Sequence, residues 1–149
     1  MANIFLIHGA FGSPNENWFP WIKSELELLG HTVIIPAFPT PNNQTLDNWK
    51  QVFTEYEQYL NTDTIMIGHS LGPSFILSIL EDCTTSIKAV YFIAGFIEPL
   101  GNKTFDQLNH TFIQKNFDWS KIKDNCKNFY LFHSDNDPYV PATTSTRLA

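Results

Sequence analysis

The chain has 149 residues, a net charge of −6 and a calculated pI near 5.2, and 43% of its residues are hydrophobic. This is the composition of a folded globular protein rather than a disordered one, and the excess of acidic over basic residues disfavours a nucleic-acid partner. No apolar run approaches the roughly 20 residues that cross a bilayer, and residues 1–8 lack the basic start of a signal peptide. We therefore expect no membrane partner and a cytoplasmic location. Cys83 and Cys126 are expected to be free thiols, because neither belongs to a C-x-x-C pair.

Apolar runs and helical periodicities alternate along the chain. We predict strands at residues 4–7, 32–35, 64–68, 88–93 and 128–133. We predict helices at residues 18–29, 46–60 and 71–82, short helices near 106 and 120, and the start of a last helix at 142–149. Gly30 is the expected C-cap of the first helix and Thr45 the N-cap of the second. This alternation predicts a three-layer α/β/α sandwich around a parallel sheet, and the length predicts one domain, residues 1–149.

The third predicted strand runs into Gly68-His69-Ser70-Leu71-Gly72, which fits the G-x-S-x-G pattern of a nucleophile elbow. A nucleophilic serine must stand clear of a cramped strand-to-helix turn, so the positions two residues before and after it favour glycine. The helix that follows would direct its N-terminal N–H groups at a developing oxyanion. An ordinary glycine-rich turn between a strand and a helix is the alternative.

Polar residues follow several of the predicted strands. They lie at the carboxyl ends of the strands, which is where the sites of parallel α/β proteins occur. They include His8 with Gly9, Ser70, and Asp135 with Asp137. The loop at 8–14 lacks the central glycine of a dinucleotide loop, so we expect no nucleotide cofactor. A metal site at His133, Asp135 and Asp137 is disfavoured, because the glycine and distal glutamate of a calcium loop are missing.

Three motifs together resemble a known family. The His8-Gly9 loop leads to residues 17–21 (Asn-Trp-Phe-Pro-Trp), the elbow follows, and residues 134–141 (Ser-Asp-Asn-Asp-Pro-Tyr-Val-Pro) come after the fifth predicted strand. On these motifs the chain resembles the α/β-hydrolase superfamily, and within it the small serine hydrolases that include retinoblastoma-binding protein 9 and its bacterial relatives. The resemblance implies a parallel sheet of about five strands in the order 2-1-3-4-5, a minimal fold without the last strand and helix.

The resemblance also implies roles for individual residues. Ser70 would be the nucleophile, and Asp137 would be the acid that orients a histidine. The backbone N–H groups of Leu71 and of Ala10, or a neighbour of Ala10, would form the oxyanion hole. A turn-capping carboxylate is the alternative for Asp137, and Asp135 is the competing acid.

The histidine that should follow the acid in the order Ser, Asp, His has no counterpart, because none of the five histidines follows His133. We expect His8 to support its loop, the His69 side chain to leave the elbow in another direction, and His31 to lie at the far edge. His133 and His110 are the candidates for a substitute base. We expect instead a chain that is incomplete at its C-terminus and is a very poor esterase, since losing the base of a comparable triad lowers kcat on the order of 10⁶-fold.

The expected function is that of a serine hydrolase of carboxylesterase type, acting on a small ester or acyl compound. A binding or regulatory protein on a hydrolase scaffold is the alternative, and an acyltransferase or haloperoxidase with the same triad is not separable from an esterase by sequence. Large apolar residues would line the pocket or belong to the core: Trp18, Phe19, Trp21, Phe96, Phe112 and Trp119. The fifth predicted strand would leave an open edge, so we expect a homo-oligomer through that edge.

Overall fold

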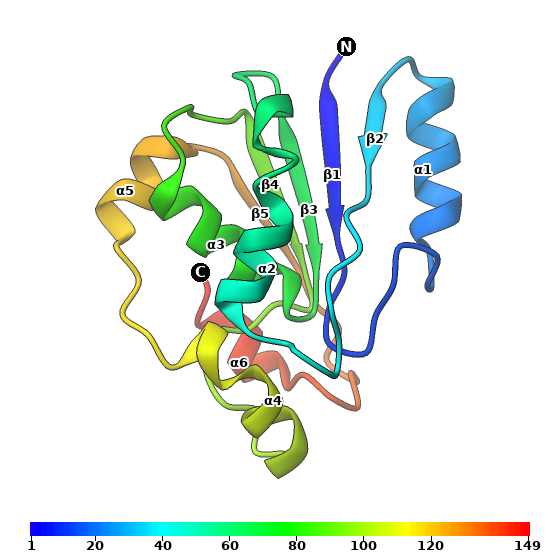
Figure 1. Cartoon of the computed structure of the whole chain (residues 1–149). Coiled ribbons are helices and arrows are strands. Elements are labelled where there is room, and N and C mark those ends of the chain that lie inside the picture. Colours follow the sequence, from blue (N-terminus) through cyan, green and yellow to red (C-terminus); the bar gives the residue numbers. More distant parts are fainter.

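A computed structural model describes residues 1–149, and its five strands form one parallel sheet in the order β2-β1-β3-β4-β5. The strands are β1 (Asn3–Ile7), β2 (Thr32–Ile34), β3 (Ile65–His69), β4 (Ala89–Ile93) and β5 (Phe129–Phe132). The predicted strands and their order are confirmed. The fold is α/β-hydrolase-like, with helices on both faces of the sheet (Figure 1).

Six α-helices connect and follow the strands. They are α1 (Phe19–Leu28), α2 (Leu46–Phe53), α3 (Gly72–Asp82), α4 (Lys103–Ile113), α5 (Trp119–Asn125) and α6 (Ala142–Thr146). The predicted N-cap is confirmed, because the Thr45 hydroxyl accepts a hydrogen bond from the Asn48 N–H at 3.2 Å. The C-cap of α1 is Leu29 instead of Gly30, and Gly30 follows it with a left-handed φ of +87°. No helix is long and apolar enough to cross a membrane.

The second helix is shorter than predicted. It ends at Phe53 instead of continuing to residue 60, and a 3₁₀ turn, Glu57–Tyr59, follows it. The Thr54 hydroxyl donates to the Gln51 carbonyl at 2.6 Å, and the Tyr56 N–H then bonds to Phe53 with 3₁₀ spacing. These local bonds compete with the helical ladder and end it.

Two apolar cores lie on opposite faces of the sheet. On one face α2, α3, α4 and α5 cover β1, β3 and β4, around a cluster of aromatic rings that includes Trp49, Phe75 and Phe112. On the other face α1 packs its Phe19 against β1 and β2. Alternate residues of each strand serve the two cores, which explains why the central strands are apolar throughout.

The face that carries α1 is not covered beyond β3. There Tyr91 of β4 stacks on Tyr130 of β5 with ring centroids 4.7 Å apart, and Phe132 stands next to them and is 54% exposed. An apolar groove lined by Trp18, Ile22, Ile67, Tyr91, Ile93 and Phe132 runs along this face. Because β5 pairs only with β4, its outer edge is open as well.

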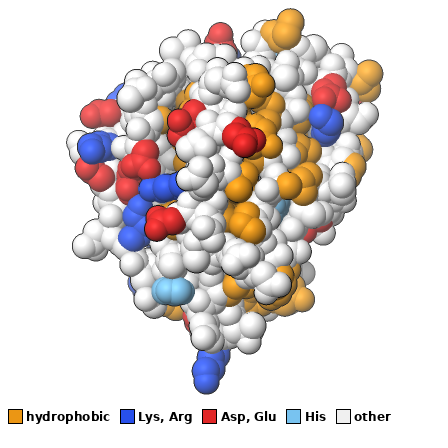
Figure 2. Space-filling model, in the orientation of Figure 1, with side chains coloured by type: hydrophobic (Ala, Val, Ile, Leu, Met, Phe, Trp, Pro, Cys, Tyr) orange, Lys and Arg blue, Asp and Glu red, His pale blue; other side chains and the backbone are white.

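The opposite face is different in character. Figure 2 shows positive and negative side chains interspersed on one side of this face and hydrophobic side chains running down its centre. Two ion pairs on this face join separate elements, Lys50 with Asp82 at 2.7 Å and Lys115 with Glu81 at 2.9 Å. The charges of Lys50 and Lys115 are therefore balanced locally by carboxylates.

Candidate active site

Ser70 lies in the sharp turn between β3 and α3, at the carboxyl edge of the sheet where α4 and α6 also gather (Figure 1). Its backbone is left-handed, with a φ of 60°, and its N–H donates to the carbonyl of Ile93 at the end of β4, at 3.0 Å. A left-handed backbone is unfavourable for a residue with a side chain, so Ser70 is held in a strained conformation. This is the backbone geometry that the G-x-S-x-G pattern predicts.

Three glycines around Ser70 are required by close contact. A Cβ on Gly68 would lie 2.7 Å from the Pro73 nitrogen, and a Cβ on Gly72 would lie 2.5 Å from the carbonyl oxygen of Ile7. A Cβ on Gly9 would lie 2.8 Å from the Cβ of Ser70 itself. The tight strand-to-helix turn therefore packs directly against the loop after β1.

Two backbone donors beside Ser70 have no acceptor within the protein. The N–H of Leu71 precedes the first turn of α3, and the N–H of Ala10 lies in the loop after β1. A Cβ on Gly9 would come within 3.2 Å of the Leu71 nitrogen, so the absence of a side chain there leaves this N–H open. Free N–H groups at the start of a helix favour negative charge.

His8 supports the loop that carries Ala10, as the sequence predicts. Its imidazole is fully buried, accepts a hydrogen bond from the Phe38 N–H at Nε2 (3.0 Å), and approaches the Gly9 carbonyl through Nδ1 at 2.9 Å. An acceptor at Nε2 requires the tautomer with hydrogen on Nδ1. Burial lowers the pKa of His8, so the ring is neutral and joins the loops after β1 and β2.

Asp137 lies in the turn between β5 and α6. One of its carboxylate oxygens, Oδ1, accepts the backbone N–H groups of Tyr139 and Val140 at 2.8 and 2.9 Å, which is the turn-capping role considered as the alternative. Its charge also acts on the imidazole of His69, where it opposes the effect of burial on the pKa. Asp135 is exposed to solvent, whereas Asp137 is half-buried and is the carboxylate whose charge acts on His69.

His69 lines the cavity at Ser70, and its ring packs edge-on against Trp18 with the centroids 5.9 Å apart. Its Nδ1 is buried and has no hydrogen-bond partner. Burial lowers the pKa of His69, so this imidazole is neutral near pH 7.

The other histidines lie away from the cavity. His110 is exposed near the end of α4, where its Nδ1 contacts the Gln107 carbonyl at 2.8 Å, and His133 is exposed directly after β5. His31 accepts a hydrogen bond from the Ala2 N–H at the opposite edge of the sheet. Neither candidate for a substitute base lines the cavity at Ser70.

A cavity of about 320 Å³ opens at Ser70. Its lining comes from the loop after β1, the elbow, α4 and the turn before α6: Gly9, Ala10, Phe11, Glu16, Asn17, His69, Ser70, Leu100, Phe105, Asn109 and Tyr139. The large apolar residues that the sequence offered as a pocket are absent from this lining, and Phe19, Phe96 and Phe112 are fully buried in the cores. Sequence reasoning missed Glu16, Phe105 and Tyr139 as lining residues.

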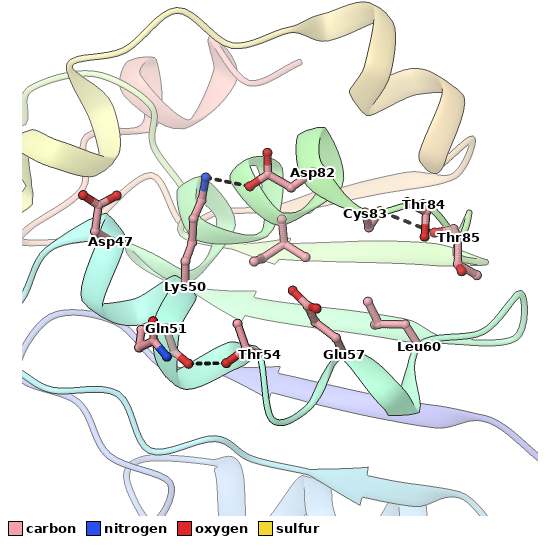
Figure 3. Close-up of a pocket in the computed structure, with 11 residues that line it drawn as sticks. Asp47, Lys50, Gln51, Thr54, Glu57, Leu60, Asp82, Cys83, Thr84 and Thr85 are labelled. Carbon is pink, nitrogen blue, oxygen red and sulfur yellow. Dashed lines mark hydrogen bonds and ion pairs between the residues drawn. The ribbon is translucent and has the colours of Figure 1, made fainter.

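A second cavity, of about 420 Å³, lies between α2 and the C-terminal end of α3, away from Ser70. Figure 3 shows the ion pair of Lys50 with Asp82 at its side. Its lining contains neither serine nor histidine, and burial raises the pKa of the Cys83 thiol, which disfavours a reactive thiolate. The groups suited to acyl chemistry are therefore those at Ser70.

The parallel sheet with helices on both faces and the strained serine between β3 and α3 define an α/β-hydrolase. Comparison with known proteins makes the assignment narrower: residues 4–149 match the sequence profile of the family described as serine hydrolase, and the chain belongs to that family.

Individual relatives agree with this assignment. The chain is 31% identical to YdeN of Bacillus subtilis over 148 residues, which is 98% of this chain and 76% of YdeN. It is 27% identical to the serine hydrolase RBBP9 of Rattus norvegicus over 125 residues, which is 83% of this chain and 64% of RBBP9. The crystal structure of YdeN superposes on the whole chain with a TM-score of 0.91 and 30% identity, and the chain covers 80% of it.

A more distant structure shows the fold alone. An extracellular α/β-hydrolase from a Paenibacillus species has a TM-score of 0.73 at 20% identity, with 100% of this chain and 87% of that chain covered.

Proposed function

We propose that the chain has the site of a hydrolase of carboxylesterase type, with Ser70 as the nucleophile on a G-x-S-x-G elbow. The observation that carries this proposal is the left-handed backbone of Ser70, with a φ of 60°, next to two backbone N–H groups that have no acceptor. The strain exposes one hydroxyl at the edge of the sheet, and the free donors lie where an oxyanion would form.

The proposed chemistry is acyl transfer through an acyl-enzyme. The Ser70 Oγ attacks the carbonyl carbon of a small ester, and the carbonyl oxygen becomes an oxyanion that accepts from the N–H groups of Leu71 and Ala10. As this intermediate collapses, the ester C–O bond breaks and the proton lost by Ser70 passes to the leaving oxygen, which releases the alcohol. Water then attacks the acyl group, one of its protons returns to Ser70, and the carboxylic acid is released. The Asp137 Oδ1 caps the turn, so the other carboxylate oxygen, Oδ2, would orient the group that takes the proton from Ser70.

We further propose that turnover by these 149 residues is very low. His69 is the one histidine that lines the cavity, but its buried Nδ1 has no hydrogen-bond partner, and His110 and His133 are exposed outside the cavity. Without a base in contact with Ser70, the oxyanion hole and substrate binding alone leave roughly 10³–10⁴-fold acceleration over water in comparable enzymes.

The absence of a base in contact with Ser70 also supports a second candidate, a non-catalytic binding or regulatory protein on a hydrolase scaffold. A location in a reducing compartment such as the cytoplasm fits both candidates, because Cys83 and Cys126 are free thiols.

The experiment that tests the proposal is covalent labelling with a fluorophosphonate, measured by intact mass. We expect slow formation of one adduct in the wild-type chain and none in Ser70→Ala, with circular dichroism confirming that both chains are folded. His69→Gln, His110→Gln and His133→Gln would then identify the group that takes the proton. A folded chain without an adduct would favour the binding protein, and turnover of a p-nitrophenyl ester at ordinary enzyme rates would contradict the proposed low activity.

A further inference from the structure

Three aromatic rings form a continuous wall of the cavity at Ser70. Phe11 contacts Phe105 edge to face with the ring centroids 5.9 Å apart, and Phe105 contacts Tyr139 in the same way at 5.8 Å. All three residues line the cavity, and they come from the loop after β1, from α4 and from the turn before α6. Phe11 is 53% exposed and Tyr139 is 64% exposed, so much of each ring is available to a ligand.

The backbone holds these exposed rings in place. Phe11 has a left-handed φ of 60°, and its N–H donates to the Thr40 hydroxyl at 2.7 Å. Tyr139 is fixed through its N–H, which donates to the Asp137 carboxylate at 2.8 Å. A strained backbone that presents an apolar ring to solvent is unfavourable for folding, and its presence beside a nucleophile indicates a binding role.

The charged side chain that lines the cavity is negative. Glu16 is the carboxylate in its lining, and the lining contains no lysine or arginine. The carboxyl group turns back over the loop, since a Cβ on Gly12 would lie 2.5 Å from its Oε1. Two further carboxylates lie next to lining residues: Asp106 accepts from the N–H of Leu100, and Asp137 accepts from the N–H of Tyr139.

Aromatic faces and a carboxylate around one opening form an environment that attracts organic cations. The face of an aromatic ring is the negative end of its quadrupole, and a cation within about 6 Å of it is stabilised. We propose that the cavity at Ser70 binds substrates that carry an alkylammonium group, with the rings of Phe11, Phe105 and Tyr139 around the cation and Glu16 as its counter-charge. This inference deepens the proposed function and rests on it for the chemistry at Ser70, but the cation site itself is defined by the wall of the cavity.

The test compares choline with 3,3-dimethylbutan-1-ol, a neutral molecule of the same shape, and with isethionate as an anion. Binding to the ¹⁵N-labelled chain is followed by NMR, which requires no turnover. We expect choline to bind about two- to fivefold more tightly than the neutral alcohol, as an exposed cation–π contact predicts, and to shift the amide signals of Phe11, Glu16 and Tyr139. Isethionate should bind most weakly.

Glu16→Gln keeps the shape of the side chain and removes its charge, so it should reduce the preference for choline. Glu57→Gln, an exposed substitution at the second cavity, is the matched control and should leave the preference unchanged. Phe11→Leu gives a second measurement if Glu16→Gln disturbs the loop, and it should also reduce the preference.

Equal binding of choline and the neutral alcohol, or choline shifts confined to another surface, would overturn the inference. Fluorophosphonate labelling is independent of this result. Labelling of Ser70 without a preference for choline would contradict the cation site alone, whereas a choline preference without labelling would contradict the proposed esterase and retain the cation site.

Discussion

The left-handed backbone of Ser70 should make the elbow less stable than a version with glycine at the same position. Ser70→Gly removes the Cβ that a φ of 60° disfavours, whereas Ser70→Ala keeps it. Both variants lack the hydroxyl, so their difference isolates the backbone strain from any effect of the serine oxygen.

The magnitude follows from two opposing contributions. A left-handed backbone costs roughly 1–2 kcal/mol for a residue with a Cβ, and it is nearly free for glycine. Glycine loses more conformational entropy on folding, by about 0.5–1 kcal/mol relative to alanine. The difference between these two contributions predicts that Ser70→Gly is more stable than Ser70→Ala by about 0.7 kcal/mol.

Urea unfolding followed by circular dichroism measures this difference. With a slope of about 2 kcal/mol/M, the midpoint of Ser70→Gly should lie about 0.4 M above that of Ser70→Ala. Gly30→Ala provides the opposite control, because Gly30 has a φ of +87° and open space around it, so this substitution should lower stability through strain alone. A Ser70→Gly chain that is no more stable than Ser70→Ala would refute the reasoning that the elbow stores strain at the nucleophile.

Three further outcomes are expected. Gly9→Ala should lower stability by about 1–3 kcal/mol, and by less in a Ser70→Gly background, because the new Cβ would lie 2.8 Å from the Ser70 Cβ; equal losses in a urea double-mutant cycle would contradict this contact. Burial lowers the pKa of His8 in the folded chain, so as the pH falls the unfolded chain binds a proton at this histidine before the folded chain does. The contribution of His8 to the free energy of unfolding should therefore be fully present above pH 6.5 and decrease below it, by up to about 1.4 kcal/mol per pH unit. His8→Gln should reduce the fall of the urea midpoint below pH 6.5, and an unchanged dependence of the midpoint on pH would mean that other groups cause this fall. Finally, we propose that the chain self-associates through the open edge of β5. Sedimentation should show a mass that rises with concentration for the wild-type chain and rises less for Tyr130→Lys; a wild-type chain that stays monomeric would exclude this association.

The positions of the strands along the chain could be predicted because each strand carries its own signal, whereas their order was implied by the family resemblance. A central strand buried on both faces is apolar throughout, and polar or glycine-rich loops mark its ends. The predicted sheet and the position of Ser70 at its carboxyl edge followed from these local patterns. The length of α2 was wrong, because Tyr56 continues the apolar spacing and packs on the core although the helix has already ended at Phe53.

The lining of the cavity could not be predicted in the same way. Phe105 and Asn109 belong to α4, in a part of the sequence with weak periodicity, and their contribution to the cavity depends on where that helix packs. Glu16 lies in a loop whose path depends on hydrogen bonds from Phe11 to Thr40 and between His8 and Phe38, which join it to the loop after β2. The apolar residues near the same positions were plausible lining from sequence, but the two cores bury them instead.

The use of glycine distinguishes this elbow from an ordinary turn. In a turn selected only for stability, glycine occupies the left-handed position because it has no Cβ to strain. Here Ser70 holds the left-handed conformation, and Gly9, Gly68 and Gly72 clear the space around it without a left-handed φ of their own. Strain is thus placed on the one residue of the turn that carries a nucleophilic oxygen, which favours a catalytic origin of the motif over a purely structural one.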